Sequence, residues 1–248
     1  MQRLCEIITA RELGADTYEL TMAAEELGRL ARPGQFLHIK CGDAVFLRRP
    51  ISICDCRDGF IKIVFRVRGA GTRWLSEQKS GKLDVLGPLG RGFDLNFKHV
   101  LLAGGGIGVP PLLYTAGEVL GLSSAILGFS SAEQIILHRQ FRERCKKVII
   151  STDDGSAGIP GLVTGPLEDA LRGGGFDGIL ACGPRPMLRA VSQLAAEYSV
   201  ACQVSLEESL ACGVGACLGC AVPMIDGGYL RVCEDGPVFS AKEVNWDA

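Results

Sequence analysis

The sequence predicts a chain of three packed parts: an N-terminal antiparallel β-barrel, a central parallel α/β sheet and a small cysteine-rich C-terminal module. Short alternating apolar runs, separated by turn residues, fill residues 1–97 and are typical of a small barrel. Over residues 98–205, apolar strands alternate with segments of helical period, which predicts a parallel sheet with crossover helices. Residues 206–248 are rich in Gly and Cys and have too few apolar residues for a core of their own.

Length and composition limit the possible classes of protein. The chain has 248 residues, 47% of them hydrophobic, which suffices for two ordinary folding units and an appendage. Its 26 basic and 28 acidic residues are scattered without long like-charge blocks, so we expect no nucleic-acid partner. No run approaches the roughly 20 apolar residues of a membrane span, and the start of the chain does not resemble a signal peptide. We therefore expect a cytoplasmic protein with no membrane partner.

The barrel half contains two candidate anion sites. The sequence Leu-Arg-Arg-Pro-Ile-Ser at 47–52 puts guanidinium groups and a hydroxyl on one strand, suited to a pyrophosphate and the edge of a flavin ring. The sequence Gly-Ala-Gly-Thr at 69–72 precedes a helical segment and forms a glycine-to-helix anion site. Taken alone, the two sites would be a surface ion pair and an ordinary helix cap. Their order along the chain favours a flavin site.

The parallel sheet is predicted from four apolar strands. These are residues 99–103, 124–129, 147–151 and 178–181. The first strand runs into Gly-Gly-Gly-Ile-Gly at 104–108 and then a helix start with proline in its first turn. A helix N-terminus behind glycines can bind phosphate, but Val109 takes the third glycine position of G-x-G-x-x-G. This loop alone could equally be a tight βα turn.

A second loop strengthens the case for a dinucleotide. The last strand leads into Cys-Gly-Pro-Arg-Pro-Met at 182–187, and ligands of open α/β sheets bind at the carboxyl ends of strands. Cys182 is interpreted either as a buried thiol or as a cofactor contact. Residues 128–132 contain no basic side chain that could hold a 2′-phosphate, which favours NADH over NADPH. Arg139 and Arg142 could still fold back toward that position.

Four of the eleven cysteines lie within 22 residues of each other, at Cys212, Cys217, Cys220 and Cys233. Disulfides do not normally persist in a reducing compartment, so closely spaced cysteines are better interpreted as metal ligands. The C-x4-C-x2-C spacing with a later fourth cysteine is that of plant-type ferredoxins and predicts a 2Fe–2S cluster. A structural zinc site is the alternative, although zinc sites usually show paired C-x2-C knuckles. The other seven cysteines are expected to act mostly as small buried hydrophobes.

The chain resembles, over nearly its whole length, the electron-transfer subunits of NAD-dependent class 1B dihydroorotate dehydrogenases, within the ferredoxin-reductase superfamily. The most specific stretches are residues 211–220, with three of the clustered cysteines, and Arg-Val-Cys-Glu-Asp-Gly-Pro-Val-Phe at 231–239. The resemblance implies FAD contacts at Arg49, Pro50, Ile51, Ser52, Val64, Phe65, Arg66, Gly71 and Thr72. It implies nicotinamide contacts at Gly104, Gly105, Gly106, Ile107, Gly108, Cys182, Gly183 and Pro184. The wider superfamily usually has tyrosine where this chain has Ile51.

The expected mechanism follows from electron counting. A hydride carries two electrons and the cluster accepts one, so a flavin must stand between NADH and the cluster. No Ser/His/Asp set or carboxylate pair suggests a catalytic acid or base, and His38, His99 and His138 are expected to be structural or solvated. The resemblance implies an FMN-containing subunit that oxidises dihydroorotate in pyrimidine (UMP) biosynthesis as partner, with two copies of each subunit.

Two alternatives remain open at this stage. One is another NAD(P)H-linked flavin and iron–sulfur subunit, such as those of ferredoxin reductases, sulfide dehydrogenases or hydrogenases. That alternative has the same fold and cofactors, so only the electron acceptor distinguishes it from an electron-transfer subunit of a dihydroorotate dehydrogenase. The other is a zinc-stapled interaction module without redox activity. Metal analysis that finds zinc and no iron would favour the second alternative.

Overall fold

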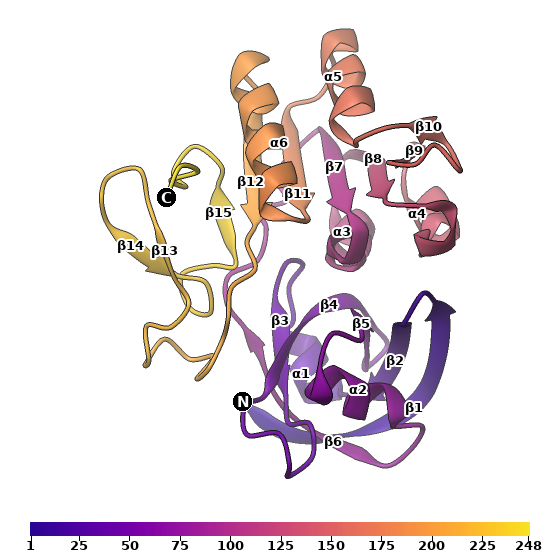
Figure 1. The fold of residues 1–248 in the computed structure, drawn as a ribbon, viewed down its shortest axis with the longest axis vertical. Helices are drawn as coiled ribbons and strands as arrows, with labels where there is room; N and C mark the ends of the chain where they lie inside the picture. The colour runs from indigo at the N-terminus through magenta and orange to yellow at the C-terminus, as the bar shows by residue number, and fades with distance from the viewer.

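A computed structural model describes residues 1–248 and contains a barrel, a sheet and a C-terminal segment (Figure 1). The barrel lies at one end of the molecule and the sheet with its helices at the other, while the C-terminal segment lies along the side of both (Figure 1). None of the helices is both long enough and apolar enough to cross a bilayer.

The barrel is closed by six antiparallel strands in the order β1-β2-β5-β4-β3-β6. They are β1 (Gln2–Gly14), β2 (Thr17–Ala23), β3 (Phe36–Ile39), β4 (Arg49–Arg57), β5 (Phe60–Arg66) and β6 (Lys82–Leu89), accompanied by helices α1 (Glu25–Leu30) and α2 (Ala70–Glu77). Alternation along β3 sends Leu37 and Ile39 into the barrel core. Phe36 and His38, on the opposite face of β3, are also buried. The outer face of this strand must therefore be covered by another part of the chain.

The sheet has seven strands in the order β10-β9-β8-β7-β11-β12-β15. They are β7 (His99–Gly105), β8 (Leu122–Phe129), β9 (Lys147–Thr152), β10 (Ile159–Pro160), β11 (Gly178–Cys182), β12 (Ala201–Ser205) and β15 (Val238–Ser240). The helices are α3 (Val109–Glu118), α4 (His138–Arg144), α5 (Thr164–Gly173) and α6 (Arg185–Glu197), with one-turn helices η1 (Gly106–Gly108) and η2 (Ala132–Gln134). The four strands predicted from the sequence are all present, and the predicted fold class is confirmed.

One edge of the sheet differs from the expected parallel arrangement. Strand β15, which comes from the C-terminal segment, pairs antiparallel with β12. The same segment forms a small hairpin from β13 (Ala221–Pro223) and β14 (Tyr229–Arg231). Its buried residues Cys220, Val222 and Phe239 join the apolar core that also contains Leu101 of β7. The C-terminal segment is therefore stabilised by packing against the sheet, as its shortage of apolar residues requires.

The barrel and the sheet pack directly on each other. Tyr114 of α3 is buried within the apolar cluster of the barrel, and its hydroxyl donates a hydrogen bond of 3.2 Å to the Ala31 carbonyl. Phe36 of β3 belongs instead to the core shared by the sheet and the C-terminal segment. These exchanged aromatic side chains hold the three parts of the chain together.

Candidate functional site

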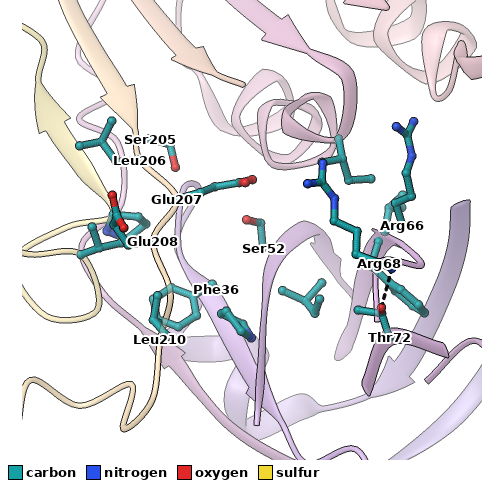
Figure 2. A pocket seen from close by; sticks show the side chains of 17 residues that line it. Phe36, Ser52, Arg66, Arg68, Thr72, Ser205, Leu206, Glu207, Glu208 and Leu210 are labelled. Atoms are coloured by element: carbon teal, nitrogen blue, oxygen red, sulfur yellow. Dashed lines mark hydrogen bonds between the residues drawn. The ribbon is translucent and has the colours of Figure 1, made fainter. Parts of the chain in front are cut away.

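A cavity of about 220 Å³ opens where the barrel, the sheet and the C-terminal segment meet (Figure 2). It is lined by Phe36, Pro50, Ile51, Ser52, Val64, Phe65, Arg66, Arg68, Thr72, Ile107, Ser205, Leu206, Glu207, Glu208, Leu210, Val232 and Pro237. Seven of the nine residues predicted to contact a flavin are among them. The two that are absent, Arg49 and Gly71, lie together close to the cavity.

Arg49 packs closely on Gly71, which explains why position 71 is occupied by a residue without a side chain. A Cβ placed on Gly71 would lie 2.6 Å from Nε of Arg49, which leaves no room for a side chain. The guanidinium also donates a 2.7 Å hydrogen bond to the Leu47 carbonyl. Gly71 lies in the first turn of α2, so the Arg49 side chain is fixed beside a helix N-terminus. Positive charge and free N–H groups at one place suit a diphosphate.

The turn before α2 is fixed by Thr72. Its Oγ1 accepts hydrogen bonds from the backbone N–H groups of Arg68 (2.8 Å) and Gly69 (3.2 Å), and this capping holds the segment before the helix (Figure 2). Arg68 itself lines the cavity, and so does Arg66 at the end of β5. The cavity therefore has two guanidinium groups on its barrel side.

A second cavity of about 560 Å³ lies at the carboxyl ends of the sheet strands. Of the eight predicted nicotinamide residues, six line it: Gly105, Gly106, Ile107, Gly108, Gly183 and Pro184. The other two, Gly104 and Cys182, pair with each other in the β7–β11 register just behind it. The chain order of the strands reverses between these two neighbours, and open α/β sheets bind ligands at such a point.

The two loops at this switch point touch without intervening side chains. A Cβ on Gly108 would contact the Cys182 carbonyl and lie 2.6 Å from the Gly183 nitrogen. Gly104 allows close packing of β7 on α3, because a Cβ there would lie 2.9 Å from Val109 at the start of α3. Gly106 has a φ of +53°, a left-handed conformation that favours glycine. Backbone N–H groups can therefore approach a bound phosphate closely.

The two cavities are neighbours that share four residues: Arg66, Arg68, Ile107 and Glu207. Figure 2 shows Glu207 and Arg68 extending toward each other from opposite sides, with Ser52 below the space between them. Desolvation raises the pKa of the Glu207 carboxyl, while the nearby Arg68 charge opposes that shift. Sequence reasoning missed Arg68 and Glu207, since neither belongs to a recognisable motif. A ligand in one cavity would lie next to a ligand in the other.

The four clustered cysteines lie on the C-terminal segment beside the barrel. Cys220 and Cys233 are buried, Cys212 is half-buried, and Cys217 is exposed. Backbone N–H groups point at the sulfurs: Gly215 donates to Cys233 Sγ over 3.1 Å, and Val214 donates to Cys212 Sγ over 3.5 Å. Two further N–H groups, of residues 217 and 219, donate to Cys212 Sγ and Cys217 Sγ.

The electrostatics of the sulfurs follow from these contacts. Hydrogen bonds from the N–H of Val214 and from neighbouring backbone groups lower the pKa of Cys212 to about 6. Burial, together with the adjacent Cys220 thiol, raises the pKa of Cys233 to about 12. No three His, Cys, Asp or Glu side chains converge at metal-ligand spacing. The soft thiol donors and the N–H groups aimed at them are nevertheless the chemistry that an iron–sulfur cluster requires.

Arg231 connects the loop that carries Cys212, Cys217 and Cys220 to the segment after β14 that carries Cys233. Its Nη1 donates to the Gly215 carbonyl over 3.0 Å, and its Nε donates to Asp235 over 2.9 Å. Glu234 forms a further ion pair with the same guanidinium at 2.7 Å. Gly215, with a φ of +77°, has no space for a side chain because a Cβ there would meet the Glu234 carboxylate. The loop that carries the first three cysteines is therefore fixed to the segment that carries the fourth.

The other seven cysteines were expected to be mostly buried, and four of them are. Cys5, Cys41, Cys54 and Cys182 are buried, whereas Cys56, Cys145 and Cys202 are half-buried. Burial raises the pKa of the Cys41 thiol to about 11, which keeps it protonated at neutral pH. Among the histidines, His99 hydrogen-bonds Ser124 at 3.1 Å, and His38 is buried rather than solvated.

This combination of barrel, doubly wound sheet and clustered thiols defines a class: an electron-transfer oxidoreductase of the ferredoxin-reductase type. Residues 207–245 match the model of the iron–sulfur cluster binding domain of dihydroorotate dehydrogenase B. The electron transfer subunit of dihydroorotate dehydrogenase B (NAD(+)) from Caldanaerobacter subterraneus subsp. tengcongensis is 43% identical, with 96% of each chain covered. That of Geobacillus thermodenitrificans is 40% identical, again over 96% of each chain. The chain belongs to this family of electron-transfer subunits.

A solved structure agrees with this assignment. An NADH-dependent reduced ferredoxin–NADP oxidoreductase, studied for flavin-based electron bifurcation, superposes with a TM-score of 0.89 at 31% identity, covering 99% of this chain and 91% of that one. The protein is thus an oxidoreductase subunit whose cofactors are FAD, a 2Fe–2S cluster and NAD(H). The family assignment decides against the zinc-stapled alternative.

Proposed function

We propose that this chain passes electrons between NAD(H) and an FMN-containing subunit that oxidises dihydroorotate, by way of its own FAD and 2Fe–2S cluster. The observation that carries the proposal is the sharing of four residues by the two cavities, next to the cysteine-bearing segment. When bound, the flavin supplies the exchange between two-electron and one-electron transfer. The chain itself supplies binding, orientation and exclusion of water.

The 220 Å³ cavity is proposed to hold the flavin ring and the start of its side chain. Pro50, Ile51 and Ser52 would face the ring from β4, and Val64, Phe65 and Arg66 would do so from β5. Arg49, fixed over Gly71 beside the N-terminus of α2 and Thr72, would hold the diphosphate. Ile51 can pack on the ring but has no hydroxyl to hydrogen-bond it.

The 560 Å³ cavity is proposed to hold the dinucleotide, and its lining favours NAD(H) over NADP(H). Asp153, directly after β9, lines this cavity together with Ser130 and Gln134, and none of these side chains is basic. A carboxylate near the ribose would repel a 2′-phosphate. The basic residues in the lining are Arg66 and Arg68, which also line the flavin cavity, and Arg66 Nη2 donates a hydrogen bond to Gln134 Oε1 over 3.3 Å. Neither Arg139 nor Arg142 lines the cavity.

Cys212, Cys217, Cys220 and Cys233 are proposed to ligate the 2Fe–2S cluster. Exposed apolar side chains lie beside the most accessible of these cysteines: Val214 is 52% exposed and Leu218 is 64% exposed. Electron tunnelling requires close approach, so an exposed ligand in an apolar rim suits electron exit to a docked subunit. This supports the cluster as the end of the path within the chain.

The partner is proposed to be the FMN-containing catalytic subunit of dihydroorotate dehydrogenase, in an assembly of two copies of each chain in the cytoplasm. Support comes from the names of the relatives, which describe a subunit and therefore a companion. Co-expression with such a catalytic subunit tests the proposal. We expect dihydroorotate to reduce NAD only when both chains are present. Failure of a correctly assembled, cofactor-loaded complex would direct attention to another electron acceptor.

A further inference from the structure

His38 is a buried imidazole that has no hydrogen-bond partner. Its side chain on β3 is 1% exposed, and neither Nδ1 nor Nε2 contacts a donor or an acceptor. The nearby Arg48 guanidinium donates to the backbone carbonyl of His38, and, being a donor, it cannot accept from the ring. A neutral imidazole always carries one N–H group, and leaving it unpaired in the interior is unfavourable. The ring therefore requires an acceptor.

The loop that carries Cys212, Cys217 and Cys220 lies against the His38 ring. A Cβ placed on Gly213 would lie 2.5 Å from His38 Nδ1 and 3.0 Å from its Cε1. Gly213 has a φ of +73° and directly follows Cys212, so its left-handed conformation and missing side chain admit the ring beside a cluster ligand. His38 thus lies against the loop that carries three of the four cysteines.

The strand also relates His38 to the flavin cavity. Phe36, two residues earlier, lies on the same outer face of β3 and lines that cavity. One short strand therefore contacts the proposed flavin site at one end and the cluster loop at the other. His38 is the polar side chain on this face, while its neighbours Leu37 and Ile39 point into the barrel.

We propose that His38 donates an N–H hydrogen bond to a sulfur of the cluster when the cluster is bound. This inference depends on the proposed ligation of a 2Fe–2S cluster by the four cysteines. Reduction adds negative charge to the cluster, so an N–H donor stabilises the reduced form and raises the reduction potential. His38 is therefore a positioning residue that connects the flavin barrel to the cluster and tunes electron transfer between them.

Pulsed electron paramagnetic resonance of the cofactor-loaded complex, prepared with ¹⁵N in the histidine rings, tests the hydrogen bond. The chain has only three histidines, and His99 and His138 belong to the sheet half. We expect the reduced cluster to show a ¹⁵N coupling that disappears in His38→Gln and persists in the control His138→Gln. A cluster signal without any such coupling, or a coupling that survives His38→Gln, overturns the role of His38 and leaves the proposed function intact. Absence of any cluster signal overturns both.

The reduction potential provides a second readout that a merely structural role would not change. His38→Leu removes the donor, and we expect the flavin–cluster equilibrium to shift about tenfold away from the reduced cluster, which is about 59 mV for one electron. His38→Gln retains an N–H donor and is expected to recover most of that shift. Equal potentials in the wild type and in a folded His38→Leu variant would contradict the proposal.

Discussion

Arg144 of α4 donates hydrogen bonds to both carboxylate oxygens of Asp55 on β4, at 3.1 Å to Oδ1 and 2.5 Å to Oδ2. Both side chains are largely buried, and Arg144 also donates to the Leu113 carbonyl over 2.8 Å. One member of the pair comes from the barrel and the other from the sheet. The pair therefore fixes the orientation of the two parts whose facing sides form the adjoining cavities.

Asp55→Ala should destabilise the protein strongly, because it leaves the Arg144 charge buried without its partner. We expect the free energy of unfolding to fall by about 3 kcal/mol. Glu25→Ala is a matched control, since it breaks the exposed Glu25–Arg29 pair of α1 and should cost at most about 0.5 kcal/mol. Denaturant unfolding of the two variants measures both values. If both variants lost a similar free energy of unfolding, the Asp55–Arg144 pair would contribute no more to stability than an exposed ion pair.

Gly71→Ala should weaken FAD binding, because the new methyl group would displace the Arg49 side chain. Loss of a charge-assisted hydrogen bond of about 1.5–3 kcal/mol corresponds to about a 10- to 100-fold rise in the dissociation constant. A Cβ on Gly69 would contact nothing within 4 Å, so Gly69→Ala is the control. Flavin fluorescence titration of the two apoproteins compares them. Equal affinities would remove Arg49 from the flavin site.

Gly108→Ala should impair use of NADH, because its methyl group would meet the backbone of Cys182 and Gly183 and force the two loops apart. We expect a higher KM for NADH and a loss of stability of about 1–3 kcal/mol from overpacking. Gly173→Ala, at the exposed end of α5 where a Cβ meets nothing within 4 Å, should leave KM unchanged. Steady-state kinetics with a flavin-reactive dye gives both values. An unchanged KM in Gly108→Ala would argue against nucleotide binding at this loop.

Asp177 should make stability depend on pH. It accepts hydrogen bonds from the backbone N–H groups of Lys98 (2.8 Å) and His99 (3.0 Å), which lower its pKa in the folded state. A lowered folded pKa gives stability that is present above the unfolded pKa of about 3.9 and is lost as pH falls through the folded value. The melting temperature of Asp177→Asn should therefore lie below that of the wild type at pH 7, and the difference should shrink below about pH 4. A difference that is constant down to pH 3 would contradict this assignment.

Sequence patterns predicted most of this architecture, because the decisive signals are local. The glycines at 104–108, the Cys-Gly-Pro loop at 182–184 and the spacing of the four cysteines each report a backbone requirement within a few residues. The structure places the first two of these segments at the carboxyl ends of β7 and β11, as expected. Strand β15 could not be predicted, since three residues carry little periodic signal and their pairing with β12 is set by packing of the whole segment.

The residues that sequence reasoning missed act through contacts between distant segments. Arg68 and Glu207 both line the two cavities, although they are far apart in the chain and belong to different parts of it. His38 was expected to be structural or solvated, and it is buried against Gly213, but its unpaired nitrogens were not foreseen. A single histidine in a strand has no signature of its own, and only the fold determines what covers it.

The most direct test of the electron path is Cys217→Ser in the complex with the dihydroorotate-oxidising subunit. Cys217 is exposed, so the substitution should spare folding while it disturbs ligation of the cluster. We expect NADH oxidation by flavin-reactive dyes to continue and electron exchange with the partner to be abolished, while Cys145→Ser, at the end of α4, retains both activities. Equal loss of both activities in Cys217→Ser would contradict the account, because the cysteines would then serve the fold rather than the exit of electrons.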